Sequence, residues 1–148
     1  MNILKLELTH FGKFHLKTIT FTSGLNIVYG KNEAGKSTIH AFVRSMLFGI
    51  PDTEEGNERY SHYLPWETPH DFCGRMWIKK DDKVYRIERN FLRPQPTVRV
   101  FDDETGESLQ PAKQHLRQIL SGLTETSYLN TICIEQLKSA TDPQLAKE

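Results

Sequence analysis

Apolar and charged residues alternate at the start of the chain, where single charged residues separate Leu4, Leu6 and Leu8. This period of two predicts a β-strand with one buried face. With turn-forming residues as boundaries, three strands are predicted in this region, over residues 2–8, 14–21 and 25–29.

A helical pattern follows the third strand. Apolar residues recur three or four positions apart, at Ile39, Phe42, Val43, Met46 and Leu47. They would form one buried stripe on a helix over residues 36–48, which Gly49 and Pro51 end. A strand that leads into a helix in this way favours an α/β fold.

The middle of the chain predicts a long polar loop over residues 51–72 and then an antiparallel meander. The expected strands of the meander cover residues 73–79, 83–90 and 97–101. Asp102 to Gly106 are typical of a hairpin turn after the last of these strands.

The C-terminal part predicts two helices and one further strand. The first helix is expected over residues 112–121 with Gly122 as its cap, and the second from a cap at Thr124 to about residue 130. A buried strand is expected over residues 131–135. Residues 142–148 have the pattern of a helix start, so we expect the chain to be the front end of a longer protein.

Composition adds few constraints. A chain of 148 residues with a net charge of zero suggests one domain and gives no global sign of a polyanionic partner. Charges interrupt the N-terminal apolar residues, and no apolar run is long enough to cross a membrane, so we expect a cytoplasmic protein. The spacing of Cys73, Cys133, His62 and His70 fits neither a disulfide framework nor a standard metal site.

The strongest chemical signal is the segment from Gly30 to Thr38, Gly-Lys-Asn-Glu-Ala-Gly-Lys-Ser-Thr, which matches the phosphate-loop pattern G-x-x-x-x-G-K-[ST]. It lies between a predicted strand and a predicted helix, as that loop requires. The predicted nucleotide-binding residues are Gly30, Asn32, Glu33, Ala34, Gly35, Lys36, Ser37 and Thr38.

Each residue type in this loop suits a nucleotide phosphate. Gly30 and Gly35 allow sharp turns and a close approach of the backbone, whose N–H groups and helix dipole attract anions. Lys36 would reach the β- and γ-phosphates as a point charge. The Ser37 hydroxyl would join the shell of Mg²⁺, which prefers oxygen ligands, and Thr38 could donate to the α-phosphate.

The order of elements resembles the N-terminal lobe of the ABC-type ATPase heads carried by long coiled-coil proteins. These include SbcC-like repair ATPases, structural-maintenance-of-chromosomes proteins and RecN, and the loop form Asn-Glu-Ala-Gly-Lys-Ser-Thr is most similar to the bacterial YhaN-like group. The segments that carry the resemblance are residues 10–14, 32–38, 47–49, 84–89 and 127–132. It implies a P-loop NTPase lobe over residues 1–141, with an antiparallel β-meander beside the P-loop strand–helix unit. Residues 142–148 would begin a coiled coil.

The resemblance also implies roles and partners. In that family a glutamine that ends a strand senses Mg²⁺ and the γ-phosphate, and Gln136 matches its place, one hundred positions after Lys36. Where the family often has a nucleotide-contacting arginine, this chain has Gly12 followed by Lys13. The implied ligands are ATP and Mg²⁺. The implied partners are the C-terminal lobe of the same head, a second head, double-stranded DNA and a nuclease subunit.

Two segments imitate motifs of a complete ATPase. Residues 98–104 end in acidic residues like a Walker B strand, and residues 120–123 are similar to the Leu-Ser-Gly-Gly signature of ABC proteins. Arg99 interrupts the first, and both precede Gln136, which reverses the family order. We therefore expect the chain to bind ATP and to hydrolyse it barely or not at all.

Two alternatives stay open. One is a self-contained P-loop NTPase or kinase that uses Asp102 or Asp103. The other is a non-catalytic module in which the nucleotide gates binding of DNA or protein.

Residues 75–99 carry eight basic side chains against three acidic ones. Phosphate contacts from such a surface would give salt-dependent DNA binding. Their alternation with apolar residues equally fits the solvated face of a meander.

Overall fold

The computed structural model describes residues 1–22 and 35–131. These residues form a six-stranded sheet with the order β2-β1-β3-β4-β5-β6, in which all neighbouring strands are antiparallel. The strands are β1 (Asn2–Phe11), β2 (Phe14–Thr20), β3 (Cys73–Lys80), β4 (Lys83–Asn90), β5 (Thr97–Asp102) and β6 (Ser108–Leu109).

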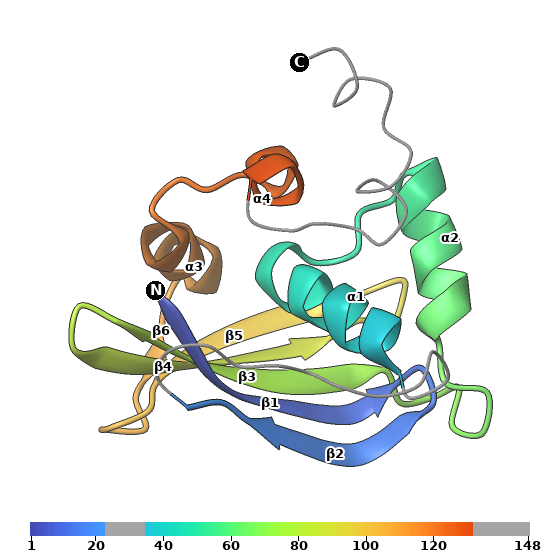
Figure 1. Ribbon diagram of the computed structural model, residues 1–148, viewed down its shortest axis with the longest axis horizontal. Helices are drawn as coiled ribbons and strands as arrows, with labels where there is room; N and C mark the ends of the chain where they lie inside the picture. Colours follow the sequence, from blue (N-terminus) through green and yellow to red (C-terminus); the bar gives the residue numbers. More distant parts are fainter. Residues whose placement is uncertain (23–34, 132–148) are drawn as a thin grey trace.

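Four described helices lie on one face of this sheet (Figure 1). They are α1 (Lys36–Phe48), α2 (Glu54–Tyr63), α3 (Ala112–Leu120) and α4 (Glu125–Thr131). Helix α1 packs over β1, β3 and β4, and α3 packs over β5. At Gly74 of β3 the helix comes so close that an added Cβ would lie 2.3 Å from the ring of Phe42.

The core lies between the sheet and the helices, and Phe11 is at its centre. This fully buried ring contacts Phe42 of α1 at 5.1 Å and Tyr63 of α2 at 5.2 Å between centroids. It also contacts Phe72 and Phe91, at 5.3 and 5.7 Å. Since Phe11 ends β1, this cluster fixes the β1–β2 turn against both helices.

The other face of the sheet, called the open face below, carries two rows of cross-strand pairs. One row alternates cations and aromatic rings, in the order Lys5, Trp77, Arg86 and Phe101. The next row alternates acids and bases, in the order Glu7, Arg75, Glu88 and Arg99. Cross-strand pairs of this kind stabilise a sheet face exposed to water.

Most predicted elements are confirmed. The expected strands over 2–8 and 14–21, the meander, the helix over 36–48 and the cap at Thr124 all occur within a few residues of the predicted bounds. Helix α3 ends one residue earlier than expected, because Ser121 already adopts a left-handed conformation with φ 53°. Thr131, predicted to begin a strand, is the last residue of α4.

The prediction of a loop over residues 51–72 was wrong, because α2 occupies much of this range. The Thr53 side chain caps the helix by accepting from the N–H of Gly56 at 3.0 Å. The buried residues of α2 are Gly56 and Arg59 rather than aliphatic side chains. An apolar period of 3.6 is therefore missing from this helix, and only the capping threonine and the following glutamates signalled it.

Some predictions fall outside the described residues. They are the strand over 25–29, the strand over 131–135 beyond Thr131, and the helix start over 142–148. Within the described residues, none of the helices has the length and apolar character needed to cross a membrane.

Candidate functional site

The phosphate-loop motif ends at the start of α1, as predicted. Helix α1 begins at Lys36, and Gly35 precedes it with φ 87° and ψ 21°. Its carbonyl accepts the first helical hydrogen bond from Ile39, at 3.0 Å. Gly30, Asn32, Glu33, Ala34 and Gln136 lie outside the described residues.

Both the backbone conformation at position 35 and the surrounding side chains require a glycine there. A Cβ at this position would lie 2.4 Å from Cζ of Phe14 and 2.9 Å from Cε of Lys13. The β1–β2 turn therefore lies directly against the start of α1. This contact brings Lys13, which follows Gly12 in the turn, beside Gly35 of the phosphate-loop motif.

The same turn is held between two helices through Gly12. Its N–H donates to the carbonyl of Tyr63 at the end of α2, at 2.7 Å. A Cβ on Gly12 would lie 3.1 Å from Cγ2 of Thr38 in the first turn of α1. The left-handed φ of 57° and this close contact both favour glycine at position 12.

The electrostatics of the start of α1 suit an anion. The first turn contains no acidic residue, and no side chain caps it within the described part of the chain. The first N–H groups of a helix lack intrahelical acceptors, and the helix dipole adds partial positive charge there. Ser37 is exposed in this turn, while Lys36 and Thr38 are partly buried.

The opposite end of α1 is held by Arg89 of β4. Its Nε donates to the carbonyl of Met46 at 2.7 Å, and an Nη donates to that of Leu47 at 3.3 Å. Burial lowers the pKa of this guanidinium to about 10, so Arg89 stays charged at neutral pH. A cation on the last carbonyls also complements the negative end of the helix dipole.

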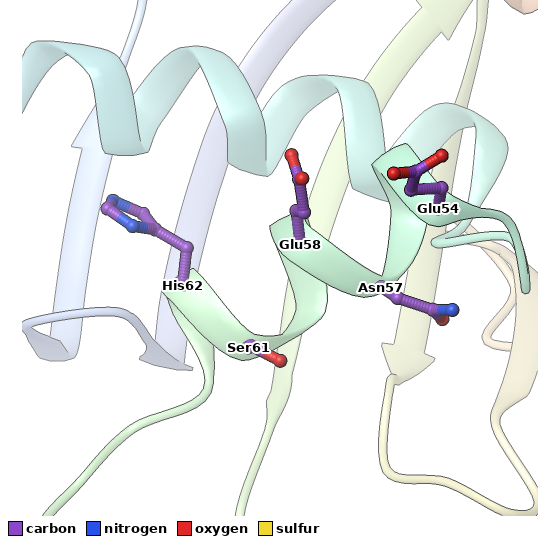
Figure 2. A pocket seen from close by; sticks show the side chains of 5 residues that line it. All are labelled: Glu54, Asn57, Glu58, Ser61 and His62. Atoms are coloured by element: carbon purple, nitrogen blue, oxygen red, sulfur yellow. The ribbon is translucent and has the colours of Figure 1, made fainter.

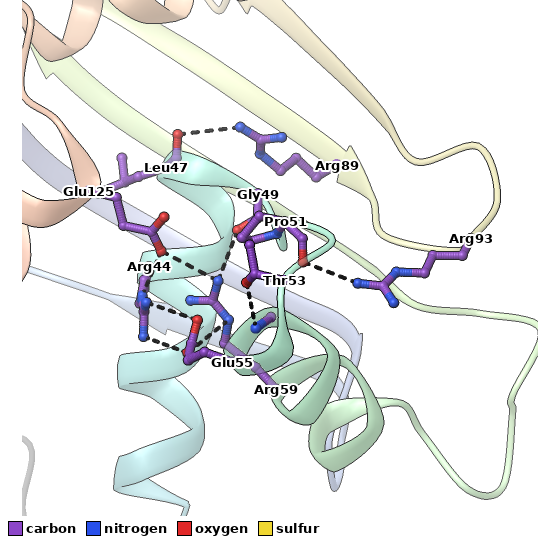
Figure 3. Close-up of polar contacts among 11 residues, drawn as sticks. Arg44, Leu47, Gly49, Pro51, Thr53, Glu55, Arg59, Arg89, Arg93 and Glu125 are labelled. Atoms are coloured by element: carbon purple, nitrogen blue, oxygen red, sulfur yellow. Dashed lines mark hydrogen bonds and ion pairs between the residues drawn. The ribbon is translucent and has the colours of Figure 1, made fainter.

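A polar cluster joins α1 to α2 and α4 (Figure 3). Arg44 of α1 donates to both carboxylate oxygens of Glu55, at 3.0 and 3.2 Å, and to Glu125 at 2.8 Å. Arg59 of α2 donates to Glu125 and to the carbonyl of Gly49, each at 3.4 Å. Arg59 is 6% exposed, and its pKa is lowered, first by desolvation and then by the charge of Arg44.

The acidic residues that imitate a Walker B motif have other contacts. Asp102 accepts from the backbone N–H groups of Glu104 and Thr105 and so shapes the hairpin turn. Asp103 accepts from the indole of Trp77 at 3.1 Å and pairs with Arg86 at 3.6 Å, on the open face. Helix α1 covers the other face, so the structure does not bring these carboxylates to the start of α1.

The eight basic residues of the segment 75–99 lie on both faces of the sheet. Lys80 donates to two carbonyls at the end of α3, at 2.7 and 2.9 Å, Arg89 binds α1, and Arg93 donates to Asn57 of α2 at 2.6 Å. Four others share the open face, namely Arg75, Lys79, Arg86 and Arg99. The eighth, Lys83, is exposed and lies opposite Lys80 next to the β3–β4 turn. Three of the eight cations thus hold helices, which reduces the surface that could contact DNA.

An open hollow runs along α2 (Figure 2), lined by Glu54, Asn57, Glu58, Ser61 and His62. All five are polar residues of one helix, and the hollow does not involve the start of α1. Among residues 1–22 and 35–131, no group of three histidine, cysteine or acidic side chains is arranged to hold a metal ion.

Sequence reasoning missed the residues that fix α1 in place. Arg44, Arg59 and Glu125 were not singled out, and Arg89 was counted only as one of several basic residues. Arginine and glutamate side chains are ordinarily solvated, so nothing in the local sequence distinguished these residues. A weak signal was available for Arg89, since its neighbours on the same face of β4 are apolar.

Comparisons with known proteins agree with the expected resemblance to YhaN-like and SbcC-like ATPase heads. The family model described as AAA domain matches residues 1–141. The chain is 43% identical over 56 residues to "Uncharacterized protein YhaN" of Bacillus subtilis, a match that covers 37% of the chain. It is 26% identical over 146 residues to "DNA double-strand break repair Rad50 ATPase" of Thermococcus kodakarensis, a match that covers 92% of the chain. These matches span 6% and 15% of the lengths of the two relatives.

Proposed function

The chain belongs to the AAA domain family, and from this premise we propose that it is the ATP- and Mg²⁺-binding half of an ATPase head in DNA repair or chromosome maintenance. The observation that carries the proposal is the start of α1, where Gly35 and Lys36 complete a phosphate-loop motif on a helix end without acidic side chains. The similarity to a relative named as a DNA double-strand break repair ATPase supports the biological context.

The residues present have complementary roles in this proposal. Backbone N–H groups at the start of α1 and the Lys36 ammonium bind the phosphates, while Gly35 lets the backbone approach them. Lys13 lies beside Gly35 and adds a second cation. The exposed Ser37 hydroxyl and Gln136 supply oxygen ligands of the kind Mg²⁺ prefers, and the bound ion would neutralise phosphate charge.

The proposal assigns hydrolysis to a larger assembly. Asp102 and Asp103 are used in a hairpin turn and on the open face, which argues against a self-contained NTPase or kinase. A general base and a signature motif would come from a C-terminal lobe and a second head. Each missing group of this kind typically costs about 10²–10³-fold in rate. Residues 1–141 would form the lobe, and 142–148 the start of the connecting coiled coil.

The direct test measures ATP binding with Mg²⁺ by calorimetry, together with steady-state hydrolysis. We expect the chain to bind ATP, Lys36→Ala to weaken binding at least about ten-fold, and neither to turn over measurably. Lys113→Ala, at an exposed lysine of α3, is the matched control and should bind like the wild type.

Other outcomes favour other functions. Turnover by the isolated chain that Lys36→Ala abolishes would support a self-contained NTPase and would implicate Asp102 or Asp103. ATP binding without turnover, even after a C-terminal lobe is supplied, would support a non-catalytic nucleotide-gated module. Equal binding by the wild type and Lys36→Ala would contradict the proposal.

A further inference from the structure

Two histidines face each other on neighbouring strands, close to the β1–β2 turn. His10 of β1 and His15 of β2 are direct cross-strand partners, and their Nδ1 atoms are 3.0 Å apart. The ring centroids are 4.5 Å apart, with an angle of 52° between the ring planes. At this distance one Nδ1 must donate a proton to the lone pair of the other, because two protonated or two unprotonated nitrogens would repel each other.

A carboxylate at the other nitrogen of His10 indicates where that ring carries its proton. Oδ2 of Asp71 lies 4.0 Å from Nε2 of His10, whose side chain is 15% exposed. This distance is longer than a hydrogen bond, but the negative charge favours a proton on Nε2. The Nδ1 of His10 then keeps a lone pair that faces His15. A metal-ligating histidine commonly presents its other N–H to a carboxylate in this way, which fixes its tautomer and orientation.

The surroundings of the pair determine how many protein ligands an ion could have. Oγ1 of Thr68 lies 3.5 Å from Nδ1 of His10, and Cys73 is the cross-strand partner of His10 on β3. Burial, and then the charge of Asp71, raise the pKa of the Cys73 thiol, which therefore stays protonated at neutral pH. Among residues 1–22 and 35–131, no three histidine, cysteine or acidic side chains surround one ion position. A site here would have two nitrogen ligands and would complete its shell with water.

We propose that Nδ1 of His10 and Nδ1 of His15 bind a divalent transition-metal ion, namely Zn²⁺. Two nitrogen ligands in a tetrahedral zinc shell lie roughly 3.3 Å apart, so the rings need to separate by only a few tenths of an ångström. The exposed His15 ring would carry its proton on Nε2 when the ion is bound. Imidazole nitrogen suits Zn²⁺, whereas Mg²⁺ prefers oxygen, so this site differs in chemistry from the proposed nucleotide site.

A bound ion would join β1 to β2 next to the turn that lies against α1. The cross-strand pair Phe11–Phe14 separates the histidines from this turn, and the Phe14 ring lies against Gly35. Because the two nitrogens come together only in the folded sheet, Zn²⁺ should bind the folded chain in preference to the unfolded one. The melting temperature should therefore rise with the concentration of Zn²⁺.

The test is a calorimetric titration of the nucleotide-free chain with Zn²⁺, with and without excess Mg²⁺. We expect His10→Ala and His15→Ala each to weaken zinc binding about ten-fold or more, and Mg²⁺ not to displace the ion. Asp71→Asn, a change at a positioning residue, should weaken binding about ten-fold. It should leave the melting temperature of the metal-free chain unchanged, which separates orientation of the ligand from a structural role.

His115→Ala is the matched control, because Nδ1 of His115 on α3 contacts the carbonyl of Pro111 instead of a second imidazole. This variant should bind Zn²⁺ like the wild type. Cys73→Ser/Cys133→Ser should also bind within about two-fold of the wild type, since the proposed ligands are nitrogens. If His10→Ala fails to fold, His15→Ala still decides the question, because the His15 side chain is exposed.

Three results would overturn the zinc site. The first is an unchanged zinc affinity in the folded histidine variants, and the second is an equal loss in His115→Ala. The third is a loss of binding in the double cysteine variant, which would place the ion on thiolates. A loss confined to the changes at His10, His15 and Asp71, together with a zinc-dependent rise in the melting temperature, would support the site.

Discussion

Gly35 has a backbone conformation and surroundings that both exclude a side chain. Its φ is 87°, and a Cβ would overlap the Phe14 ring. Gly106 has a similar φ of 75°, but apart from its chain neighbours no atom of the described residues lies within 4 Å of the position that a Cβ would take there, which makes it a matched control. We expect Gly106→Ala to cost about 1–2 kcal/mol from the backbone alone, and Gly35→Ala about 1–3 kcal/mol more from overpacking.

Urea unfolding of the two variants checks this prediction, and ATP titration checks its consequence. Gly35→Ala should also weaken ATP binding, because the backbone at the start of α1 must shift to relieve the overlap. If both alanine variants lost the same stability, the contact between the β1–β2 turn and α1 would be too loose to position Lys13.

Cys73 provides a second prediction at this scale. Burial raises the pKa of its thiol above the ordinary value of 9.0, and the carboxylate of Asp71 raises it further. In a Cys133→Ser background we expect iodoacetamide to alkylate Cys73 more slowly at pH 8.5 than it alkylates free cysteine. The rate should still rise above pH 9, whereas a plateau below pH 8.5 would show that the thiolate is stabilised instead.

At the scale of the elements, α1 depends on Arg89 at its C-terminal end. Arg89→Met removes the donors to the carbonyls of Met46 and Leu47 and leaves them unsatisfied. We expect a loss of about 1–3 kcal/mol in the free energy of unfolding. Arg75→Met, at a half-exposed arginine of the open face that pairs with Glu88, should cost less than about 1 kcal/mol.

The pH dependence of this difference follows from the pKa of Arg89. Burial lowers that pKa to about 10 in the folded protein, well below the ordinary value of an arginine, and both states are protonated at neutral pH. The difference between the wild type and Arg89→Met should therefore stay constant between about pH 6 and 9. It should increase only above pH 10, where the unfolded chain binds more protons than the folded one.

Sequence patterns predicted the helices and strands that bury apolar side chains. The stripe that includes Phe42 and Met46 gave α1 its bounds, and alternation gave the strands of the meander. Helix α2 could not be predicted in this way. Its buried residues are Arg59 and Gly56, so the helix lacks a repeating apolar stripe.

For the candidate site, the spacing of the phosphate-loop motif correctly located the start of α1. The cluster around Glu125 requires contacts between residues 81 positions apart, which no local pattern encodes.

At the scale of the whole molecule, the sheet separates two surfaces with different roles. The helix-covered face carries α1, with Gly35 to Thr38 of the phosphate-loop motif at its start, and the contacts that fix α1, while the open face carries cross-strand pairs. On the open face Glu88 pairs with Arg75 and Arg86, at 3.2 and 3.5 Å, and Asp103 pairs with Arg86. These acids neutralise much of the positive charge that the sequence concentrates between residues 75 and 99.

This arrangement predicts that the open face is a solvated surface rather than a DNA interface. We expect the isolated chain to bind duplex DNA weakly, and Lys79→Gln/Arg99→Gln to change the affinity less than about two-fold. Fluorescence anisotropy over a series of salt concentrations provides the measurement. If the two side chains contacted phosphates, the variant would have a less steep dependence of binding on salt. The negative slope of the logarithm of the association constant against log salt would decrease in magnitude by about 1.8. A loss of that size would assign DNA binding to this face, whereas an unchanged slope would leave any DNA contact to other surfaces of the assembled head.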